Sequence, residues 1–235
     1  MQQYGNTRVA RFMTKNKHPA NGRFIAIEGV DGAGKGVQSR LLRDALQNCK
    51  VPVLLTREPG GSEGAEQIRS LLVSGDTDKW DSMTELLLVY AARRSHLQQT
   101  ILPALAKGIW VISDRFADSS RAFQGIAGGL GLEVVEKIHQ EVVGVHNPDL
   151  VLVLDLDPST SLQRAKQRGT GEDRFEKKGE GYQRKVRDGF RMLAQRSPLT
   201  HRLIDASASV EAVAGTIRQQ VAAALHLPAL LTLEP

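Results

Sequence analysis

The stretch FIAIEGVDGAGKG at residues 24–36 joins an apolar run to a glycine-rich segment that ends in Gly-Lys-Gly. The apolar run predicts a buried strand, and the apolar spacing beyond it predicts a helix over residues 34–48. Residues 29–35 match the pattern G-x-x-x-x-G-K, the P-loop, in the strand–loop–helix context that the pattern requires. A glycine-rich structural turn is the alternative.

Backbone N–H groups of a P-loop face one concavity at a helix N-terminus, where an anionic phosphate is stabilised. Lys35 can reach the β- and γ-phosphates of ATP and offset their charge during transfer. The residues expected to bind these phosphates are Gly29, Val30, Asp31, Gly32, Ala33, Gly34, Lys35 and Gly36.

Position 36 departs from the P-loop pattern, because Gly36 stands where Ser or Thr supplies an oxygen to Mg²⁺. Mg²⁺ usually keeps several waters and needs few protein ligands, and a glycine leaves room for one more water. We therefore expect Mg²⁺ to bind more weakly rather than to be lost.

Apolar runs alternate with longer helical patterns along the chain, which is typical of a parallel sheet covered by helices. The expected strands cover residues 24–27, 51–56, 108–113, 150–155 and 202–205. The expected helices cover residues 34–48, 63–74, 81–107, 118–143 with a break near 128–129, 158–168, 175–196 and 209–226. The predicted fold class is α/β, a three-layer doubly wound parallel sheet of about five strands flanked by helices.

Composition places the 235-residue chain among ordinary globular proteins, with 41% hydrophobic and 24% charged residues. The single cysteine, Cys49, excludes an internal disulfide and a multi-cysteine metal site, and it fits the reducing cytoplasm. No apolar run reaches about 18 residues, so neither a membrane span nor a membrane partner is expected.

The net charge of +5 comes from the N-terminus. The first 23 residues hold five basic residues and no acid, and the remainder is balanced. A nucleic-acid partner is therefore not expected. Residues 1–22 predict a disordered basic extension, with an organelle presequence as the alternative. One domain is expected over residues 23–226, followed by a loose tail at 227–235.

Three further segments are specific: TREPGGS at residues 56–62, DRF at 114–116 leading into AFQG at 122–125, and RGTGEDRFE at 168–176. In this order behind a P-loop, they resemble the bacterial-type thymidylate kinase family of P-loop nucleoside monophosphate kinases, over about residues 23–222. The resemblance implies a P-loop kinase fold, ATP as phosphate donor with Mg²⁺, dTMP as acceptor and a homodimer.

The first two of these segments follow predicted strands, and open α/β sheets bind ligands at the carboxyl ends of their strands. We therefore expect Asp31, Arg57, Asp114 and Arg115 to converge above Lys35. Two arginines and a lysine facing carboxylates suit a phosphate clamp. Surface or salt-bridge roles are the alternative for each arginine.

Roles follow from the resemblance. Arg57 would hold the monophosphate of the acceptor with help from Arg115, and Asp114 would position the metal through water. Asp31 would contact the sugar hydroxyl, with a loop-capping carboxylate as the alternative. The residues expected to face the base and sugar are Ser120 and Gln124.

The base pocket departs from the family pattern of an aromatic residue four positions before an arginine. The segment VYAARR at residues 89–94 allows the pairs Val89/Arg93 or Tyr90/Arg94. We expect Arg93 to read the base, with Tyr90 swinging in or partly compensating for the missing ring. The preferred pyrimidine therefore stays open, and a related kinase of altered pyrimidine specificity is an alternative.

Residues 168–176 resemble a lid that closes over ATP, with Arg168 and Arg174 as candidates for the catalytic arginine. An exposed charged loop is the alternative. The residues expected to serve catalysis are thus Asp31, Lys35, Arg57, Asp114, Arg115, Arg168 and Arg174. Gly36 also leaves open a catalytically weak nucleotide-binding regulator.

Overall fold

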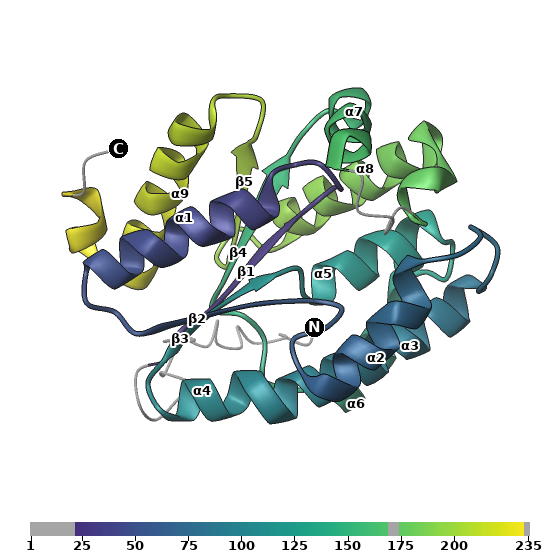
Figure 1. The fold of residues 1–235 in the computed structure, drawn as a ribbon, viewed down its shortest axis with the longest axis horizontal. Helices are drawn as coiled ribbons and strands as arrows, with labels where there is room; N and C mark the ends of the chain where they lie inside the picture. Colours follow the sequence, from purple (N-terminus) through teal and green to yellow (C-terminus); the bar gives the residue numbers. More distant parts are fainter. Residues whose placement is uncertain (1–21, 169–173, 233–235) are drawn as a thin grey trace, which may run out of the picture.

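A five-stranded parallel sheet runs through the centre of the protein (Figure 1). The computed structural model describes residues 22–168 and 174–232. The strands are β1 (Phe24–Gly29), β2 (Val53–Arg57), β3 (Trp110–Asp114), β4 (Leu150–Asp155) and β5 (His201–Asp205). Their order is β2-β3-β1-β4-β5, and every neighbouring pair is parallel. The parallel sheet predicted from the sequence is confirmed.

The central strand β1 is buried along its whole length, which explains its run of apolar residues. Its Ile27 pairs with Asp114 of β3, and Asp114 pairs with Arg57 of β2. This register brings the carboxyl ends of three strands level with one another. The loops that leave these ends meet at one edge of the sheet, where ligands bind in such folds.

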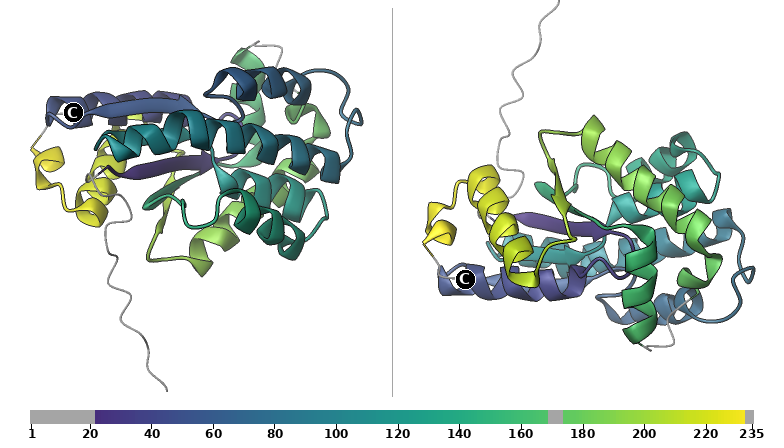
Figure 2. Two further views of the ribbon diagram at one scale, coloured as in Figure 1. Left: turned by 90° about the horizontal axis from the view of Figure 1, so that it is seen from below. Right: turned by 90° about the horizontal axis from the view of Figure 1, so that it is seen from above.

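Helices cover both faces of the sheet, as the three-layer prediction requires (Figure 2). On one face lie α1 (Lys35–Asn48) and α9 (Val210–Leu225). The opposite face carries α4 (Leu102–Ala106), α5 (Ala117–Ser120) and α8 (Glu180–Arg196). The remaining helices are α2 (Glu63–Val73), α3 (Ser82–His96), α6 (Leu132–Val142) and α7 (Pro158–Arg168).

Two of the predicted long helices are interrupted by wider π-helical turns. The pattern at residues 81–107 divides into α3, a π turn at Leu97–Ile101 and α4. The pattern at 118–143 divides into α5, a π segment at Arg121–Ala127 and α6, with the expected glycine break before α6. Such turns are frequent at functional sites, and the second one carries Phe123 and Gln124.

Strand β2 begins at Val53, two residues later than predicted. The amide of Val51 instead donates to the carbonyl of Leu46 and closes the end of α1, at a distance of 3.0 Å. Pro52 then has no N–H group for the ladder.

The C-terminal segment differs from the loose tail that the sequence suggested. Pro228–Leu231 forms a 3-10 turn against α9, with Leu230 fully buried. The predicted basic extension, except Gly22, and residues 169–173 of the predicted lid lie outside the described residues. Among the helices that the structure describes, none is both long and apolar enough to span a bilayer.

Candidate active site

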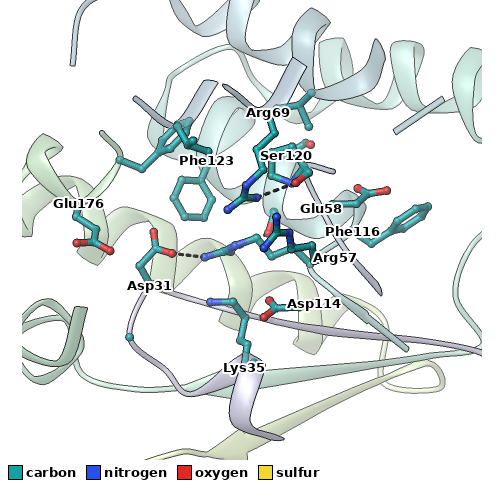
Figure 3. A pocket seen from close by; sticks show the side chains of 18 of the residues that line it. Asp31, Lys35, Arg57, Glu58, Arg69, Asp114, Phe116, Ser120, Phe123 and Glu176 are labelled. Carbon is teal, nitrogen blue, oxygen red and sulfur yellow. Dashed lines mark hydrogen bonds and ion pairs between the residues drawn. The ribbon is translucent and has the colours of Figure 1, made fainter. Parts of the chain in front are cut away.

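A cavity of about 650 Å³ opens at the carboxyl edge of the sheet (Figure 3). It lies between the P-loop, the ends of β2 and β3, helix α3 and the segments that flank residues 169–173. The predicted site residues that line it are Asp31, Gly32, Gly34, Lys35, Gly36, Arg57, Arg93, Asp114, Arg115, Ser120 and Gln124. The structure therefore brings together most of the proposed phosphate and base contacts.

The P-loop bends sharply between β1 and α1. Gly32 and Gly34 have φ angles of 84° and 89°, a region that side chains with a Cβ rarely adopt. A Cβ on Gly32 would also collide with the backbone oxygen of Ser161. The first turn of α1 carries no acidic residue, so its N–H groups and partial positive charge are open to an anion.

Lys35 is 7% exposed, and its Nζ donates to the carbonyl of Val30 at 2.8 Å. Burial, reinforced by the positive charge of Arg115, lowers the pKa of Lys35 to about 8. Asp114 and Asp31 act in the opposite direction. A polyphosphate placed beside this amine would favour its charged form.

Arg115 is held by the P-loop itself. Its NH2 donates to Oδ1 of Asp31 at 2.6 Å, and its NH1 donates to the carbonyl of Gly29 and to Oγ of Ser119, both at 2.9 Å. Its backbone adopts a φ of 72°, and its guanidinium lies 5.2 Å from the centre of the Phe123 ring. Asp31 thus forms an ion pair with Arg115 at the mouth of the phosphate loop.

Glu28, the last side chain before the P-loop, fixes the turn that carries Arg115. Its carboxylate is fully buried and accepts from the amides of Phe116 and Ser119, at 2.8 and 3.1 Å. It also accepts from Oγ of Ser119 at 2.6 Å. Burial raises the pKa of Glu28, and the nearby carboxylate of Asp118 raises it further. Sequence reasoning missed this role, although an acid at the end of an apolar strand is a visible signal.

Arg57 lies at the outer wall of the cavity, with a side chain 55% exposed. Its NH2 donates to Oε2 of Glu66 at 3.2 Å. Arg69, which the sequence analysis did not single out, also lines the cavity and donates to the carbonyl of Pro59 at 2.7 Å. The two arginines flank the loop that follows β2, where a phosphate group can be held bidentately.

Arg93 occupies the inner wall and is 1% exposed. Its Nε donates to Oε2 of Glu58 at 2.7 Å, and its NH1 and NH2 donate to Oγ of Ser120 and the carbonyl of Phe116. No role was expected for Glu58 or Phe116 from the sequence. Arg93 is therefore rigidly placed, as a base-reading residue requires.

Tyr90 does not line the cavity, whereas Val89 does. The ring of Tyr90 lies behind Arg93, 4.5 Å from its guanidinium, and its hydroxyl contacts Nδ1 of His139 at 3.3 Å. The structure thus places Tyr90 outside the cavity, away from the position of the missing stacking ring. Phe123 and Phe175 bring aromatic side chains to the cavity instead, whereas the ring of Phe116 packs against Phe24 and the guanidinium of Arg93.

Asp114 lies beside Lys35 in the cavity (Figure 3). A Cβ added at Gly36 would come within 3.4 Å of Oδ2 of Asp114, so the space beside this carboxylate fits a water or a hydroxyl group. Among the described residues, no cluster of three or more His, Cys, Asp or Glu side chains suits a metal. A single carboxylate beside a phosphate loop fits Mg²⁺ that is held mainly by phosphates and waters.

The two candidate lid arginines differ in what the structure describes. Arg174 is fully buried; its Nε donates to the carbonyl of Asp76 at 2.8 Å, and its NH2 pairs with Glu85 at 2.8 Å. It does not join the arginines of the cavity. Arg168 ends α7, and its side chain lies outside the described part of the chain. Arg164, four residues earlier, lines the cavity and was missed, although this spacing places both on one helix face.

A P-loop that opens a helix, with lysine and arginines gathered at the carboxyl edge of a parallel sheet, defines a P-loop nucleotide-binding protein equipped for phosphoryl transfer. Comparison with known proteins gives the family. The thymidylate kinase family model matches residues 27–217, and the chain belongs to this family.

Individual relatives of the chain belong to the same family. A thymidylate kinase of Jannaschia sp. is 51% identical over 195 residues, covering 83% of this chain and 93% of that protein. The thymidylate kinase of Caulobacter vibrioides is 46% identical, covering 88% of this chain and 99% of that protein. The crystal structure of thymidylate kinase from Ehrlichia chaffeensis superposes with a TM-score of 0.70 at 30% identity, covering 86% of this chain and 99% of that one.

Proposed function

We propose that this protein transfers the γ-phosphoryl group of ATP to dTMP, giving ADP and dTDP. The observation that carries the proposal is the cavity that brings the P-loop and Lys35 together with Arg57 and Arg115, in a chain of the thymidylate kinase family. Phosphoryl transfer depends on positioning and on stabilising charge, and the cavity supplies both.

The donor half of the site is the P-loop. Its amides and Lys35 hold the β- and γ-phosphates of ATP, and Asp114 orients the metal through water. Mg²⁺, when bound, neutralises charge on the phosphate oxygens. The chain itself provides the rigid backbone cradle and one buried cation at the reacting group.

The acceptor half lies between β2, α3 and the π segment. The monophosphate of dTMP is bound by Arg57, Arg69 and Arg115, and its sugar is contacted by Asp31. The residues that bind the base are Arg93, Ser120 and Gln124, beside the ring of Phe123. Each guanidinium is held by carboxylates or carbonyls, so little ordering is needed when the substrate binds.

The lid function falls to Arg168, assisted by Arg164 on the same helix. Closure would place a cation on the transferring phosphoryl group and exclude water, which limits hydrolysis of ATP. Arg174 instead anchors the far side of the lid through Glu85.

The test is a coupled ADP-release assay with dTMP, run with and without Mg²⁺. We expect ADP release that depends on both dTMP and the metal, and a loss of at least about 100-fold for Lys35→Met. Nucleotide binding without any ADP release would instead support the alternative of a non-catalytic regulator.

A kinase of altered pyrimidine specificity is the second candidate, and the presence of Val89 in the cavity in place of an aromatic ring favours it. Rates with dTMP, dUMP, UMP and dCMP separate the two candidates. A clear preference for a non-thymine nucleotide would replace the first candidate by the second.

The proposed setting is a cytoplasmic homodimer without nucleic-acid or membrane partners. The proposed kinase domain covers residues 23–226. Met83 and Leu87 are exposed one turn apart on α3, with 53% of Leu87 accessible, and this apolar face suits a second copy of the chain. Sedimentation equilibrium of the wild type and of Leu87→Glu tests the dimer, which the substitution should weaken.

A further inference from the structure

Glu85 on α3 connects the end of the lid to the base pocket. It is 1% exposed, and its Oε1 pairs with NH2 of Arg174 at 2.8 Å and with Nζ of Lys178 at 2.7 Å. Its Oε2 accepts a hydrogen bond from Nε2 of Gln124 at 3.1 Å. One buried carboxylate therefore joins the segment after residues 169–173 to a residue that lines the acceptor cavity.

The charges around Glu85 determine which end of the Gln124 amide faces it. Arg174 is permanently charged, and the second cation, Lys178, lies against the same oxygen, so Glu85 is an ionised carboxylate. An ionised carboxylate only accepts hydrogen bonds, and the amide group of Gln124 must turn its NH₂ toward it. The amide oxygen, Oε1, is then the group that Gln124 offers to a ligand in the cavity.

We propose that Glu85 is a positioning residue for substrate selection, because it fixes Gln124 with its carbonyl oxygen toward the base. An acceptor in that place favours a pyrimidine whose ring N3 carries a hydrogen, as in thymine and uracil. It disfavours cytosine, whose N3 is itself an acceptor. This inference rests on the proposed function, since it concerns the acceptor nucleotide of the same site.

Four neighbouring contacts hold Arg174 and Lys178 in place. Arg174 also donates to the carbonyls of Asp76 and Thr77, at 2.8 and 3.1 Å, which ties it to the loop before α3. Lys178 lies 5.1 Å from the ring centres of both Phe175 and Tyr182. The two cations are thereby held in place on Glu85, and the side of the lid that follows residue 173 bears directly on base selection.

The experiment compares kcat/KM for dTMP with kcat/KM for dCMP, with competitive inhibition by dCMP as a second measure of its binding. The variants are Glu85→Gln, Gln124→Leu and their combination. Glu133→Gln, on an exposed side chain of α6, is the matched control. Glu85→Gln keeps the shape of the side chain but can face Gln124 with either end of its amide.

We expect Glu85→Gln to lower the dTMP/dCMP ratio about tenfold, since one well-placed hydrogen bond discriminates by roughly that factor. Gln124→Leu should lower the ratio similarly, and the double variant should lower it no further. KM for ATP should stay at the wild-type value in all these variants. The dTMP/dCMP ratio of the control variant Glu133→Gln should also stay at the wild-type value.

An active Glu85→Gln enzyme with the wild-type ratio would overturn the inference, whatever its stability. So would additive losses in the double variant. If Glu85→Gln does not fold, Lys178→Met decides, because it removes one cation at a partly exposed position and should lower the ratio by about twofold to threefold. A wild-type enzyme without dTMP turnover would remove the proposed function, a result distinct from an unchanged ratio.

Discussion

Lys35 carries its positive charge in a place that water hardly reaches, so its protonation depends on what occupies the phosphate loop. In the free protein its pKa is lowered from 10.5 to about 8 by burial. The unfolded chain therefore binds more protons than the folded one between pH 8 and 10.5, and the stability of the free protein rises with pH across that window.

A bound polyphosphate should restore the charge of Lys35, so nucleotide binding should take up a proton above pH 8. We expect ATP affinity to fall by up to about tenfold per pH unit above that value. Calorimetry at pH 8.5 in two buffers of different ionisation enthalpy measures the uptake, and the same titration at pH 6.5 serves as its control. If ATP binding takes up no proton at pH 8.5, Lys35 is not the group that gains charge when the phosphate loop is occupied.

Gly36 leaves an open space beside Asp114, and a side-chain oxygen placed there can reach a metal. We expect Gly36→Thr to lower the Mg²⁺ concentration for half-maximal activity by about fivefold, one ligand contact being worth about 1 kcal/mol. The added Cβ would lie 3.4 Å from Oδ2 of Asp114, an ordinary contact. Gly36→Ala adds the same Cβ without the oxygen and should leave the requirement unchanged. Equal requirements for wild type and Gly36→Thr would refute this account.

At the scale of the secondary-structure element, each helix determines which of its residues line the cavity, because only one of its faces lies against it. On α3, Val89 and Arg93 lie one turn apart and line the cavity, while Tyr90 packs behind them. The π segment at Arg121–Ala127 widens the helix and turns Phe123 and Gln124 into the site. The lining of the cavity thus depends on how two helical segments are rotated about their axes.

The two arginines that flank residues 169–173 should respond differently to truncation. Arg174→Ala removes a buried partner of Glu85 and should lower the free energy of unfolding by about 3–5 kcal/mol. Arg168→Ala should leave stability unchanged and lower kcat by about 100-fold or more, with little change in ATP affinity. Urea denaturation and steady-state kinetics on both variants measure this. A fully stable but inactive Arg174→Ala protein would return Arg174 to the catalytic set.

At the scale of the whole molecule, buried polar contacts tie the peripheral helices together. His139 of α6 is 4% exposed and lies between the hydroxyl of Tyr90 on α3 and the amide of Asn147, whose Oδ1 is 2.8 Å from Nε2. Burial, together with the charge of Arg121, lowers the pKa of His139 to about 4. The ring is therefore neutral in the folded protein at neutral pH.

Protonation of His139 should contribute to acid unfolding. Because its folded pKa lies below the ordinary value of 6.5, the unfolded chain binds more protons between pH 4 and 6.5. The stabilising contribution is complete above pH 6.5 and is lost as pH falls toward 4, up to about 3 kcal/mol. His139→Gln should flatten the dependence of unfolding free energy on pH in this window. His226→Asn, at an exposed position, should not, and equal slopes for all three proteins would exclude His139 as the cause.

Local sequence patterns determined strand β1, the phosphate loop, helix α1 and the succession of the five strands along the chain. They could do so because the periodicity of apolar residues and the backbone conformation of glycine depend on residues close in sequence. They also located the cavity residues of the phosphate loop and of the ends of β2 and β3, since parallel strands end at one edge of a sheet.

Only the tertiary structure decided where the side chains point. It buried Arg174 against Glu85, turned Tyr90 away from the cavity, and paired Glu58 with Arg93. The physical reason is that contacts such as the one between Glu85 and Gln124 join residues far apart in sequence. Their geometry follows from how whole helices pack, and no local pattern carries that information.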